Sequence, residues 1–245
     1  MEKALPFRFF IIHPKVAVLE WDTEPNPRLL KLLIGFQKAI LKEFKEVSQI
    51  TQGYCSLMLH HNCEIHYIDD YPNSLYLLFD SLSDYSFTKQ KIWQIPVCYD
   101  ESISPDLKSL ANQLNISTAS LVREHTSATY EVNFIGFLPG FLYLSGLPKV
   151  LECRRKARPA SRVDRGSIGI GGKQTGIYPI ESPGGWHLIG KTPYPLFEPK
   201  KKNPCFAKAG DSIQFLSISK SNYLELEKQR EQGTLKIKPL LLRFS

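Results

Sequence analysis

Residues 130–148 read YEVNFIGFLPGFLYLSGLP, residues 166–179 read GSIGIGGKQTGIYP, and residues 182–186 read SPGGW. Glycine permits positive φ and close backbone approach, whereas proline fixes φ and lacks an N–H donor, so paired Pro-Gly steps specify tight bends. Short apolar segments alternate with such bends from residue 129 to residue 215. This pattern predicts an antiparallel β-barrel or sandwich with shaped loops.

The first 90 residues predict a separate α+β domain, a small α/β sandwich in which helices pack on a sheet. Asn26 followed by Pro27 is a typical helix start, because asparagine caps the first turn and proline suits the first helical position. Apolar residues then recur at helical spacing from Leu29 to Phe44. We expect Asn73 to cap a second helix. Strands are expected at residues 5–12, 16–21, 47–51 and 54–59.

Residues 91–245 are expected to form the barrel domain with a C-terminal extension. A strand is expected at residues 92–99, and helices are expected to begin at Ser104 and Ser117. His125 is expected just beyond the second of these helices, where its side chain could point into a pocket. Residues 222–232 predict a further helix, and residues 234–244 predict a late strand.

The composition is that of a globular protein. The 245 residues are 42% hydrophobic and carry a net charge of +7, without the long basic tract that nucleic-acid binding favours. No apolar run is long enough for a membrane span, and the N-terminus lacks the pattern of a signal peptide. The five cysteines have no C-x-x-C spacing, and an odd number argues against a disulfide framework. We therefore expect a cytoplasmic protein with free thiols that binds neither nucleic acid nor membranes.

The three quoted segments resemble the KipI / allophanate hydrolase subunit 1 family, which includes the B subunit of bacterial 5-oxoprolinase. The likeness is specific from about residue 95 to residue 215. It implies that the barrel is cyclophilin-like. It also implies one component, inactive alone, of an enzyme that hydrolyses 5-oxo-L-proline to L-glutamate with ATP. The implied partners are a KipA-like and a LamB/YcsF-like protein, and ATP with Mg belongs to the complex without being assigned to this chain.

The resemblance leaves two other roles open. Relatives named KipI inhibit a sporulation histidine kinase by docking on it, so this chain could be a binding module. The same pair of domains also occurs fused in urea carboxylase, which suggests a carboxyltransferase-type subunit. Binding of a KipA-like protein favours an enzyme subunit, and binding of a kinase favours the inhibitor.

The glycine-rich segment at residues 169–176, GIGGKQTG, has two interpretations. Consecutive glycines let several backbone N–H groups converge on a phosphate or carboxylate, and Gln174 and Thr175 add polar side chains. The alternative is a glycine-rich corner of the barrel. The family resemblance places the segment in an active-site cleft.

Two residues are predicted to be catalytic. His125 could move a proton near neutral pH, or it could simply satisfy the last carbonyls of a helix; relatives carry a histidine here, which favours the first role. Gln174 could stabilise an anion formed during lactam opening. The residues predicted to bind substrate are Arg155, Gly171, Gly172, Thr175, Tyr178, Gly184, Gly185 and Trp186.

A basic block precedes the glycine-rich segment, and guanidinium groups suit bidentate capture of carboxylate or phosphate. Here the chain departs from the family, which usually shows two Pro-Arg pairs. Arg155 keeps the first arginine, but Ala160 replaces the second, and Asp164 stands where proline is usual. Activity or specificity could differ unless Arg158 or Arg162 reaches the same place.

Three further patterns suggest less. Residues 185–192, GWHLIGKT, match a phosphate-binding P-loop letter for letter, but Pro193 and Pro195 prevent the helix that a P-loop requires, so we expect a strand. The ligand-type side chains of residues 60–66 match no standard zinc spacing, and we expect no metal site. Among the aromatic residues, Phe137 and Tyr143 are expected in the core and Trp186 as an exposed anchor.

Overall fold

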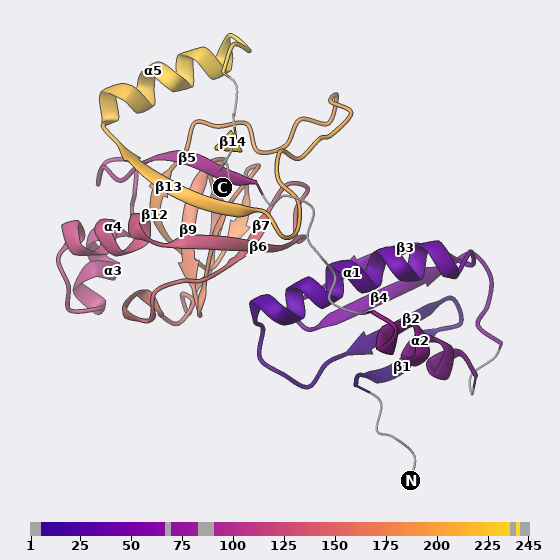
Figure 1. Ribbon diagram of the computed structural model, residues 1–245. Helices are drawn as coiled ribbons and strands as arrows, with labels where there is room; N and C mark the ends of the chain where they lie inside the picture. Colours follow the sequence, from indigo (N-terminus) through magenta and orange to yellow (C-terminus); the bar gives the residue numbers. More distant parts are fainter. Residues whose placement is uncertain (1–5, 67–69, 83–90, 236–238, 241–245) are drawn as a thin grey trace, which may run out of the picture. The chain divides into compact units, whose positions relative to one another are not determined.

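The computed structural model describes residues 6–66, 70–82, 91–235 and 239–240 (Figure 1). The chain packs into two compact units, Met1–Lys89 and Gln90–Ser245. The first unit is a sheet with two helices, and the second is a barrel with three α-helices in its described part. The molecule is thus of the mixed α+β class, as the sequence predicts.

Unit 1 is an antiparallel sheet of four strands in the order β1-β2-β4-β3. Its elements are β1 (Arg8–His13), β2 (Val16–Glu20), α1 (Pro27–Glu43), β3 (Val47–Gln52), β4 (Ser56–His61) and α2 (Asp70–Asp80). As predicted, Asn26 caps α1, since its side chain accepts a hydrogen bond from the N–H of Leu29 at 2.9 Å. The predicted cap at Asn73 is wrong, because α2 already begins at Asp70.

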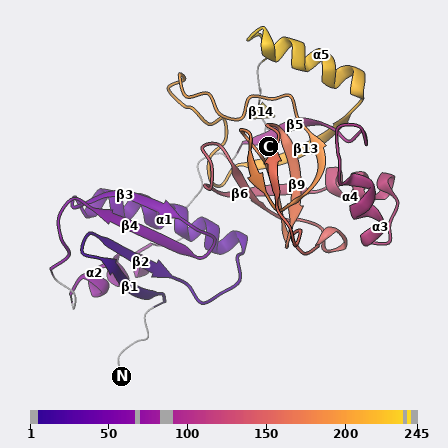
Figure 2. The same ribbon diagram turned by 180° about the vertical axis from the view of Figure 1, so that it is seen from behind.

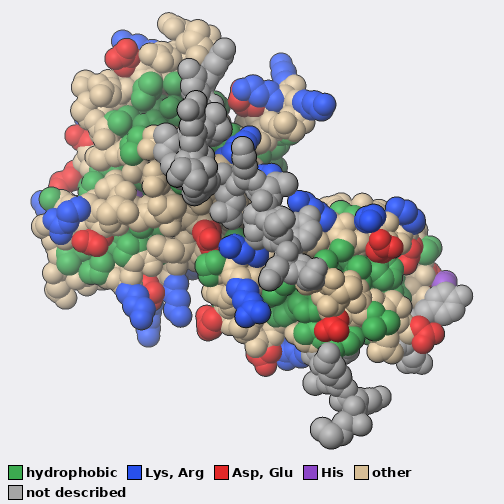
Figure 3. All heavy atoms as spheres, in the orientation of Figure 1, with side chains coloured by type: hydrophobic (Ala, Val, Ile, Leu, Met, Phe, Trp, Pro, Cys, Tyr) green, Lys and Arg blue, Asp and Glu red, His purple; other side chains and the backbone are tan. Residues whose placement is uncertain are grey.

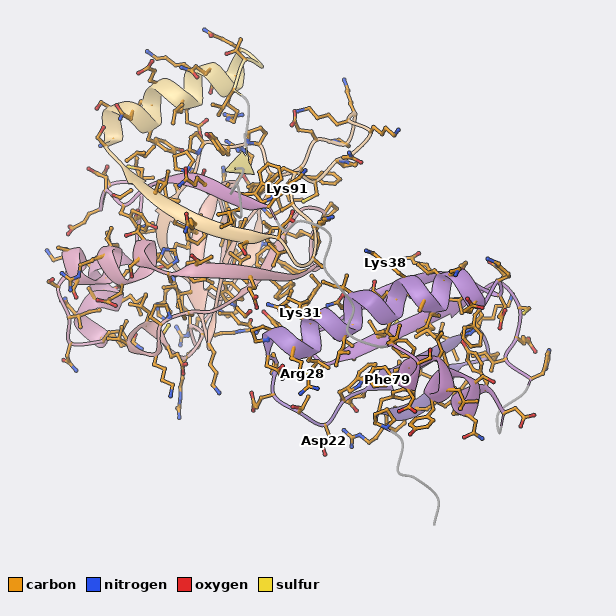
Figure 4. All side chains as sticks on the ribbon, viewed as in Figure 1. Asp22, Arg28, Lys31, Lys38, Phe79 and Lys91 are labelled. Carbon is orange, nitrogen blue, oxygen red and sulfur yellow. The ribbon has the colours of Figure 1, made fainter. Side chains whose placement is uncertain are left out.

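An aromatic cluster fills the core of unit 1 between the helices and the sheet. Phe79 of α2, labelled in Figure 4, lies 5.1 Å from the ring of Phe36 on α1 and 5.9 Å from those of Phe7 and Trp21. Tilted and edge-to-face rings at these distances attract one another beyond the burial of their area. Because apolar residues recur at helical spacing in α1, they lie on one face of the helix, and that face packs into this core.

Unit 2 is a closed barrel of seven strands, in the order β12-β9-β10-β7-β6-β13-β5, with a pairing of β12 to β5 that completes the ring. Its strands are β5 (Ile92–Cys98), β6 (Thr129–Ile135), β7 (Leu142–Ser145), β8 (Ala160–Val163), β9 (Ser167–Gly171), β10 (Gln174–Ile177), β11 (Ser182–Gly184), β12 (His187–Lys191), β13 (Ser212–Ile218) and β14 (Pro239–Leu240). β8 and β11 pair only with each other, beside the barrel.

The helices of unit 2 lie outside the barrel, with α3 and α4 together and α5 apart from them (Figure 2). They are α3 (Leu107–Gln113), α4 (Thr118–Ser127) and α5 (Lys220–Glu231), with a short 3-10 turn, η1 (Lys149–Leu151). Ser117 caps α4 as predicted, through the N–H of Ser120 at 3.0 Å. α3 begins later than the expected Ser104, and α5 is capped by Ser219, three residues before the expected start. Of the late strand expected at residues 234–244, β14 lies in the described part, while residues 236–238 and 241–245 lie outside it.

The surface carries charges of both signs. On the face shown in Figure 3, lysine and arginine side chains are spread over both units with acidic side chains among them. In the described parts of the chain we find no helix with the length and apolar character that crossing a bilayer demands.

Candidate functional site

The hairpin of β9 and β10 organises the site, because its two faces differ in character. Side chains alternate along a strand, so neighbouring residues face opposite sides of the sheet. Ile168, Ile170 and Ile177 are fully buried in the barrel core. On the opposite face the register pairs Gly169 with Gly176 and places Gly171 across from Gln174. The outer face of this hairpin is therefore nearly bare of side chains.

The turn of this hairpin decides between the two interpretations of the glycine-rich segment. Gly172 has φ of 67°, and it donates a hydrogen bond to the carbonyl of Cys153 at 2.6 Å while accepting one back at 3.2 Å. Its N–H group is therefore already used by the protein. The segment is a barrel hairpin with a two-residue turn, which favours the barrel corner over the anion-binding nest.

The bare outer face holds the indole of Trp186. A Cβ atom added to Gly171 would lie 2.6 Å from this ring, one on Gly176 would lie 2.9 Å from it, and one on Gly169 would lie 3.0 Å from Trp186 Cβ. Real Cβ atoms essentially never approach closer than 3.0 Å, so Gly171 and Gly176 have no room for a side chain, and Gly169 has little. Trp186 is only 5% exposed, which corrects the expectation of an exposed anchor.

A pocket of about 340 Å³ opens beside Trp186. This volume lies within the range typical of small-molecule sites; five of the eleven lining residues are aromatic and two are cations. The pocket is lined by Phe137, Phe141, Tyr143, Arg155, Lys156, Pro159, Tyr178, Pro183, Gly184, Gly185 and Trp186. Five of the residues predicted to bind substrate are thus brought together here, namely Arg155, Tyr178, Gly184, Gly185 and Trp186.

Phe141 is the centre of the aromatic wall. Its ring lies edge-on to four others, at 5.0 Å from Tyr143, 5.4 Å from Tyr178 and 5.6 Å from both Trp186 and Phe137. Edge-to-face contacts of this kind fix the relative orientation of the rings. The hydroxyl of Tyr178 lies against Gly184, where an added Cβ would be 2.5 Å away. The wall is therefore a packed, preformed surface.

The two cations of the pocket differ in their partners. Lys156 forms an ion pair of 2.5 Å with Asp106, which also accepts a hydrogen bond from the backbone N–H of Leu188 at 2.7 Å. Arg155 is exposed, and its guanidinium carbon lies 5.7 Å from the centre of the Trp186 ring. Among the residues that the structure describes, no carboxylate pairs with Arg155. The pocket therefore keeps one uncompensated positive charge beside an aromatic surface.

The tyrosine hydroxyls of the pocket respond to this environment. Burial raises the pKa of Tyr178 above its ordinary value, and the N–H of Trp186 and the charge of Arg155 partly oppose that shift. Burial likewise raises the pKa of Tyr143, again against the charge of Arg155. Both phenols therefore stay protonated near neutral pH and can donate hydrogen bonds to an anion.

His125 lies elsewhere, in the barrel core. It belongs to the last turn of α4 rather than following it, and it is fully buried. The hydroxyl of Thr175 donates to the carbonyl of Gly169 at 3.0 Å, so it accepts from Nε2 of His125, also at 3.0 Å. Nδ1 then accepts from the Tyr99 hydroxyl at 2.8 Å. Both ring nitrogens are occupied.

The burial of His125 determines its charge as well as its position. Loss of hydration lowers its pKa to about 3, so the ring is neutral at ordinary pH. A proton carrier must reach the reacting atoms, and this imidazole has no exposed surface. The expected position of His125 and Thr175 at a cleft is wrong: both form a satisfied polar network of the core. Gln174 is partly buried, its Oε1 accepts no hydrogen bond from described residues, and its catalytic role stays a prediction.

The structure also shows what stands in place of the missing arginine. Ala160 begins β8 and packs against the cluster that includes Trp186 and Tyr178. Arg162 lies two residues further on and pairs with Glu181 at 2.9 Å and Asp164 at 3.5 Å. Neither Arg162 nor Arg158 lines the pocket. Neither residue therefore supplies the missing charge in this structure.

The segment that matches a P-loop forms β12 at His187–Lys191, as the following prolines predicted. A strand cannot direct successive N–H groups at a phosphate as a helix start does, so these residues do not fit ATP. In unit 1, Nε2 of His61 lies 2.8 Å from the hydroxyl of Tyr71, which gives this side chain a partner within the core. No three His, Cys, Asp or Glu side chains in the described parts gather as a metal site would require.

Some pocket residues were missed by sequence reasoning. Phe137 was assigned to the core but is 62% exposed at the pocket, with φ of 65°. A bulky residue in that region is strained by roughly 1–3 kcal/mol. The surrounding Gly136 and Pro139-Gly140 steps are a signal for a shaped loop, although they do not say which way the ring points. Lys156 could not be separated from its basic neighbours, because its partner Asp106 lies fifty residues earlier.

The comparisons with known proteins agree with one another. Residues 7–207 match the family model described as carboxyltransferase domain, subdomain C and D. A protein of Bacillus subtilis, named as the B subunit of 5-oxoprolinase, is 42% identical over 146 residues, which are 60% of this chain and 60% of that protein. Another of the same name, from Escherichia coli O157:H7, is 46% identical over 50% of this chain and 56% of its own length. The aligned regions thus span less than two thirds of these relatives.

Solved structures show the same fold. The crystal structure of TTHA0988 superposes with a TM-score of 0.72 at 26% identity, over 87% of this chain and 41% of that one. The urea amidolyase of K. lactis superposes with a TM-score of 0.80 over 96% of this chain and 16% of that one; its 16% identity speaks for the fold alone. The chain therefore belongs to the carboxyltransferase-domain family of subdomains C and D, and within it to the group that contains the B subunit of 5-oxoprolinase.

Proposed function

We propose that this chain is the B subunit of an ATP-dependent 5-oxoprolinase, and that the pocket beside Trp186 binds 5-oxo-L-proline. The observation that carries the proposal is the uncompensated Arg155 next to the aromatic wall, in a chain whose curated relatives are named as that subunit. A small, compact ring with one carboxylate matches both features. The complex would include a KipA-like and a LamB/YcsF-like protein, and it would act in the cytoplasm.

The chemistry follows from the charges of the pocket. A guanidinium can bind a carboxylate with two parallel hydrogen bonds, which fixes the orientation of the bound molecule as well as its position. The flat face of a lactam ring can then pack on Trp186 or Phe141, and the tyrosine hydroxyls can donate to its oxygen atoms. The chain thereby holds the amide in one orientation and reduces its contact with water.

Hydrolysis itself needs further groups. An unstrained lactam opens uphill, and transfer of phosphate to its carbonyl oxygen would make a better electrophile for water. ATP and Mg would supply that step at the level of the complex, and no residue of this chain is assigned to it. His125 is excluded from our proposal as a proton carrier, because it is enclosed in the core.

A carboxyltransferase-type subunit is the second candidate. It is favoured by the description of the matching family model. The same pocket could then hold a different small anion. Docking on a histidine kinase stays a prediction from the family resemblance.

The experiment is to co-express the chain with its KipA-like and LamB/YcsF-like partners and to measure ATP-dependent glutamate release from 5-oxoproline. Arg155→Ala is the test variant and Arg154→Ala the control, since Arg154 is exposed and does not line the pocket. Loss of a charge-assisted contact lowers kcat/KM by roughly tenfold to a hundredfold, whereas the control should match the wild type. A stable complex that releases no glutamate would contradict the proposal and favour the carboxyltransferase role.

A further inference from the structure

The loop between β6 and β7 presents one aromatic ring to solvent at the pocket. Phe137 is 62% exposed, although large apolar side chains are usually buried, and it takes the left-handed backbone region that disfavours bulky residues. Both features oppose the folded state. They coincide at a residue that lines the pocket with Arg155 and Trp186.

The backbone of the loop holds this ring where it is. Leu138 N–H donates to the carbonyl of Gly136 at 2.8 Å, and Phe141 N–H donates to that of Leu138 at 3.0 Å. Gly140 has φ of 84°, and an added Cβ there would lie 2.7 Å from Phe197. The loop is therefore a closed, tightly packed bend. The ring itself touches the pocket wall edge-on, 5.6 Å from Phe141 at 89°.

We propose that Phe137 covers the pocket and packs on a small carboxylate that has a compact apolar body and is anchored by Arg155. The inference rests on the proposed function, which it deepens by assigning a residue that determines ligand size and retention. A bound ligand of this class would remove the exposed ring from water and so offset the cost of presenting it. A ligand is favoured over a protein partner because the ring lines the same cavity as the anchoring arginine.

The test measures ligand binding and activity together. The purified full chain is titrated by calorimetry with three compounds: 5-oxoproline, cyclopentanecarboxylate, and the neutral lactam 2-pyrrolidinone. Phe137→Ala and Phe137→Gly remove the ring, Phe137→Tyr keeps it, and Phe10→Ala in unit 1 is the control, because Phe10 is a 43% exposed phenylalanine outside the pocket. The same variants are then assayed for KM and kcat in the reconstituted complex.

We expect removal of the ring to weaken binding of the carboxylates about tenfold, and to raise KM more than it lowers kcat. Phe137→Tyr keeps the ring and should regain most of the affinity that Phe137→Ala loses, whereas Phe10→Ala should stay within about twofold of the wild type. Phe137→Gly should melt no lower than Phe137→Ala, because glycine tolerates positive φ. Weaker ligand binding without a corresponding loss of stability would show that Phe137 contacts the ligand and does not merely stabilise the fold.

Other results would overturn the inference. Equal carboxylate affinity in the wild type and in both ring-removing variants would do so, as would the absence of binding by any carboxylate. Loss of partner subunits from Phe137→Ala with unchanged ligand affinity would show a docking residue instead. If cyclopentanecarboxylate binds in a way that depends on Phe137 while the complex releases no glutamate, the role of Phe137 in ligand binding is supported. The 5-oxoprolinase proposal then fails.

Discussion

The two faces of the β9–β10 hairpin share one backbone and differ in almost everything else. On the inner face, Thr175 lies among isoleucines and completes the hydrogen bonds of a fully buried His125. On the outer face, glycines leave room for Trp186, which borders a pocket whose Arg155 pairs with no carboxylate among the described residues. Polar residues inside are satisfied by one another, whereas those outside keep capacity for a ligand. The presence of polar side chains alone therefore does not identify a binding site. Polar groups that still have hydrogen bonds or charge to offer a ligand do identify one.

The largest effect should come from removing the polar centre of the inner face. His125→Ala leaves the hydroxyl of Tyr99 without its partner, removes the hydrogen bond that Thr175 accepts and creates a cavity, which costs about 3–5 kcal/mol of unfolding free energy. Urea denaturation measures this change. The control is His187→Ala, since His187 is partly exposed and its imidazole makes one hydrogen bond with described residues, to the carbonyl of Arg154. If His125→Ala lowers the free energy of unfolding by less than about 1 kcal/mol, the hydrogen bonds of His125 do not stabilise the inner face as described.

The next effect concerns pH and also belongs to the inner face. The pKa of His125 is lowered to about 3 by burial, while an unfolded histidine titrates near 6.5. Between these values the unfolded chain binds a proton that the folded chain does not. Stability is therefore full above pH 6.5 and falls as the pH decreases, by up to about 1.4 kcal/mol per pH unit.

The measurement for this pH effect is the free energy of unfolding at pH 7 and pH 5, in wild type and His125→Gln. Glutamine keeps a donor and an acceptor but does not titrate, so the variant should lose less stability between the two values. His61 in unit 1, whose pKa burial also lowers, is present in both proteins and cancels from the difference. Identical pH dependence in the two proteins would show that His125 is charged or exposed.

A third prediction tests the outer face through its glycines. Gly171→Ala places a methyl group where the indole of Trp186 lies, and overpacking of this kind costs about 1–3 kcal/mol. The displaced indole should also weaken 5-oxoproline binding. Gly172→Ala is the matched control, since an added Cβ there meets no atom within 4 Å and only the positive φ is unfavourable, at about 1 kcal/mol. Equal binding by both variants would contradict the role of Gly171 as space for Trp186.

These two faces also show what the sequence could predict. The spacing of glycines, prolines and apolar residues indicated the barrel, and the Asn26-Pro27 step indicated where α1 begins. The family motif selected Arg155, Tyr178 and Trp186, which do meet in one pocket. It could not separate them from Thr175, because one step along a strand reverses the face, and a motif does not state which face is closed.

The remaining errors concern contacts between distant residues. His125 was placed beyond its helix because the end of α4 depends on packing against the barrel, where the imidazole stacks 4.7 Å from Phe215. The glycines of β9 suggested an anion nest because their true partner, Trp186, lies beyond the hairpin in the sequence. The exposure of Phe137 depends on a bend in which Gly140 packs against Phe197, a residue nearly sixty positions further along the chain.

The smallest effect on stability is expected from substituting two adjacent cations of the outer face, Lys156 and Arg155, which should respond differently. Lys156→Met removes the partner of the half-buried Asp106 and should cost about 1–2 kcal/mol. Arg155→Met breaks no ion pair with a described residue and should stay within about 0.5 kcal/mol of the wild type, while 5-oxoproline binding falls. Urea denaturation and calorimetry measure the two quantities. If Arg155→Met destabilises the chain as much as Lys156→Met does, Arg155 holds the fold together and its positive charge is not available to a ligand.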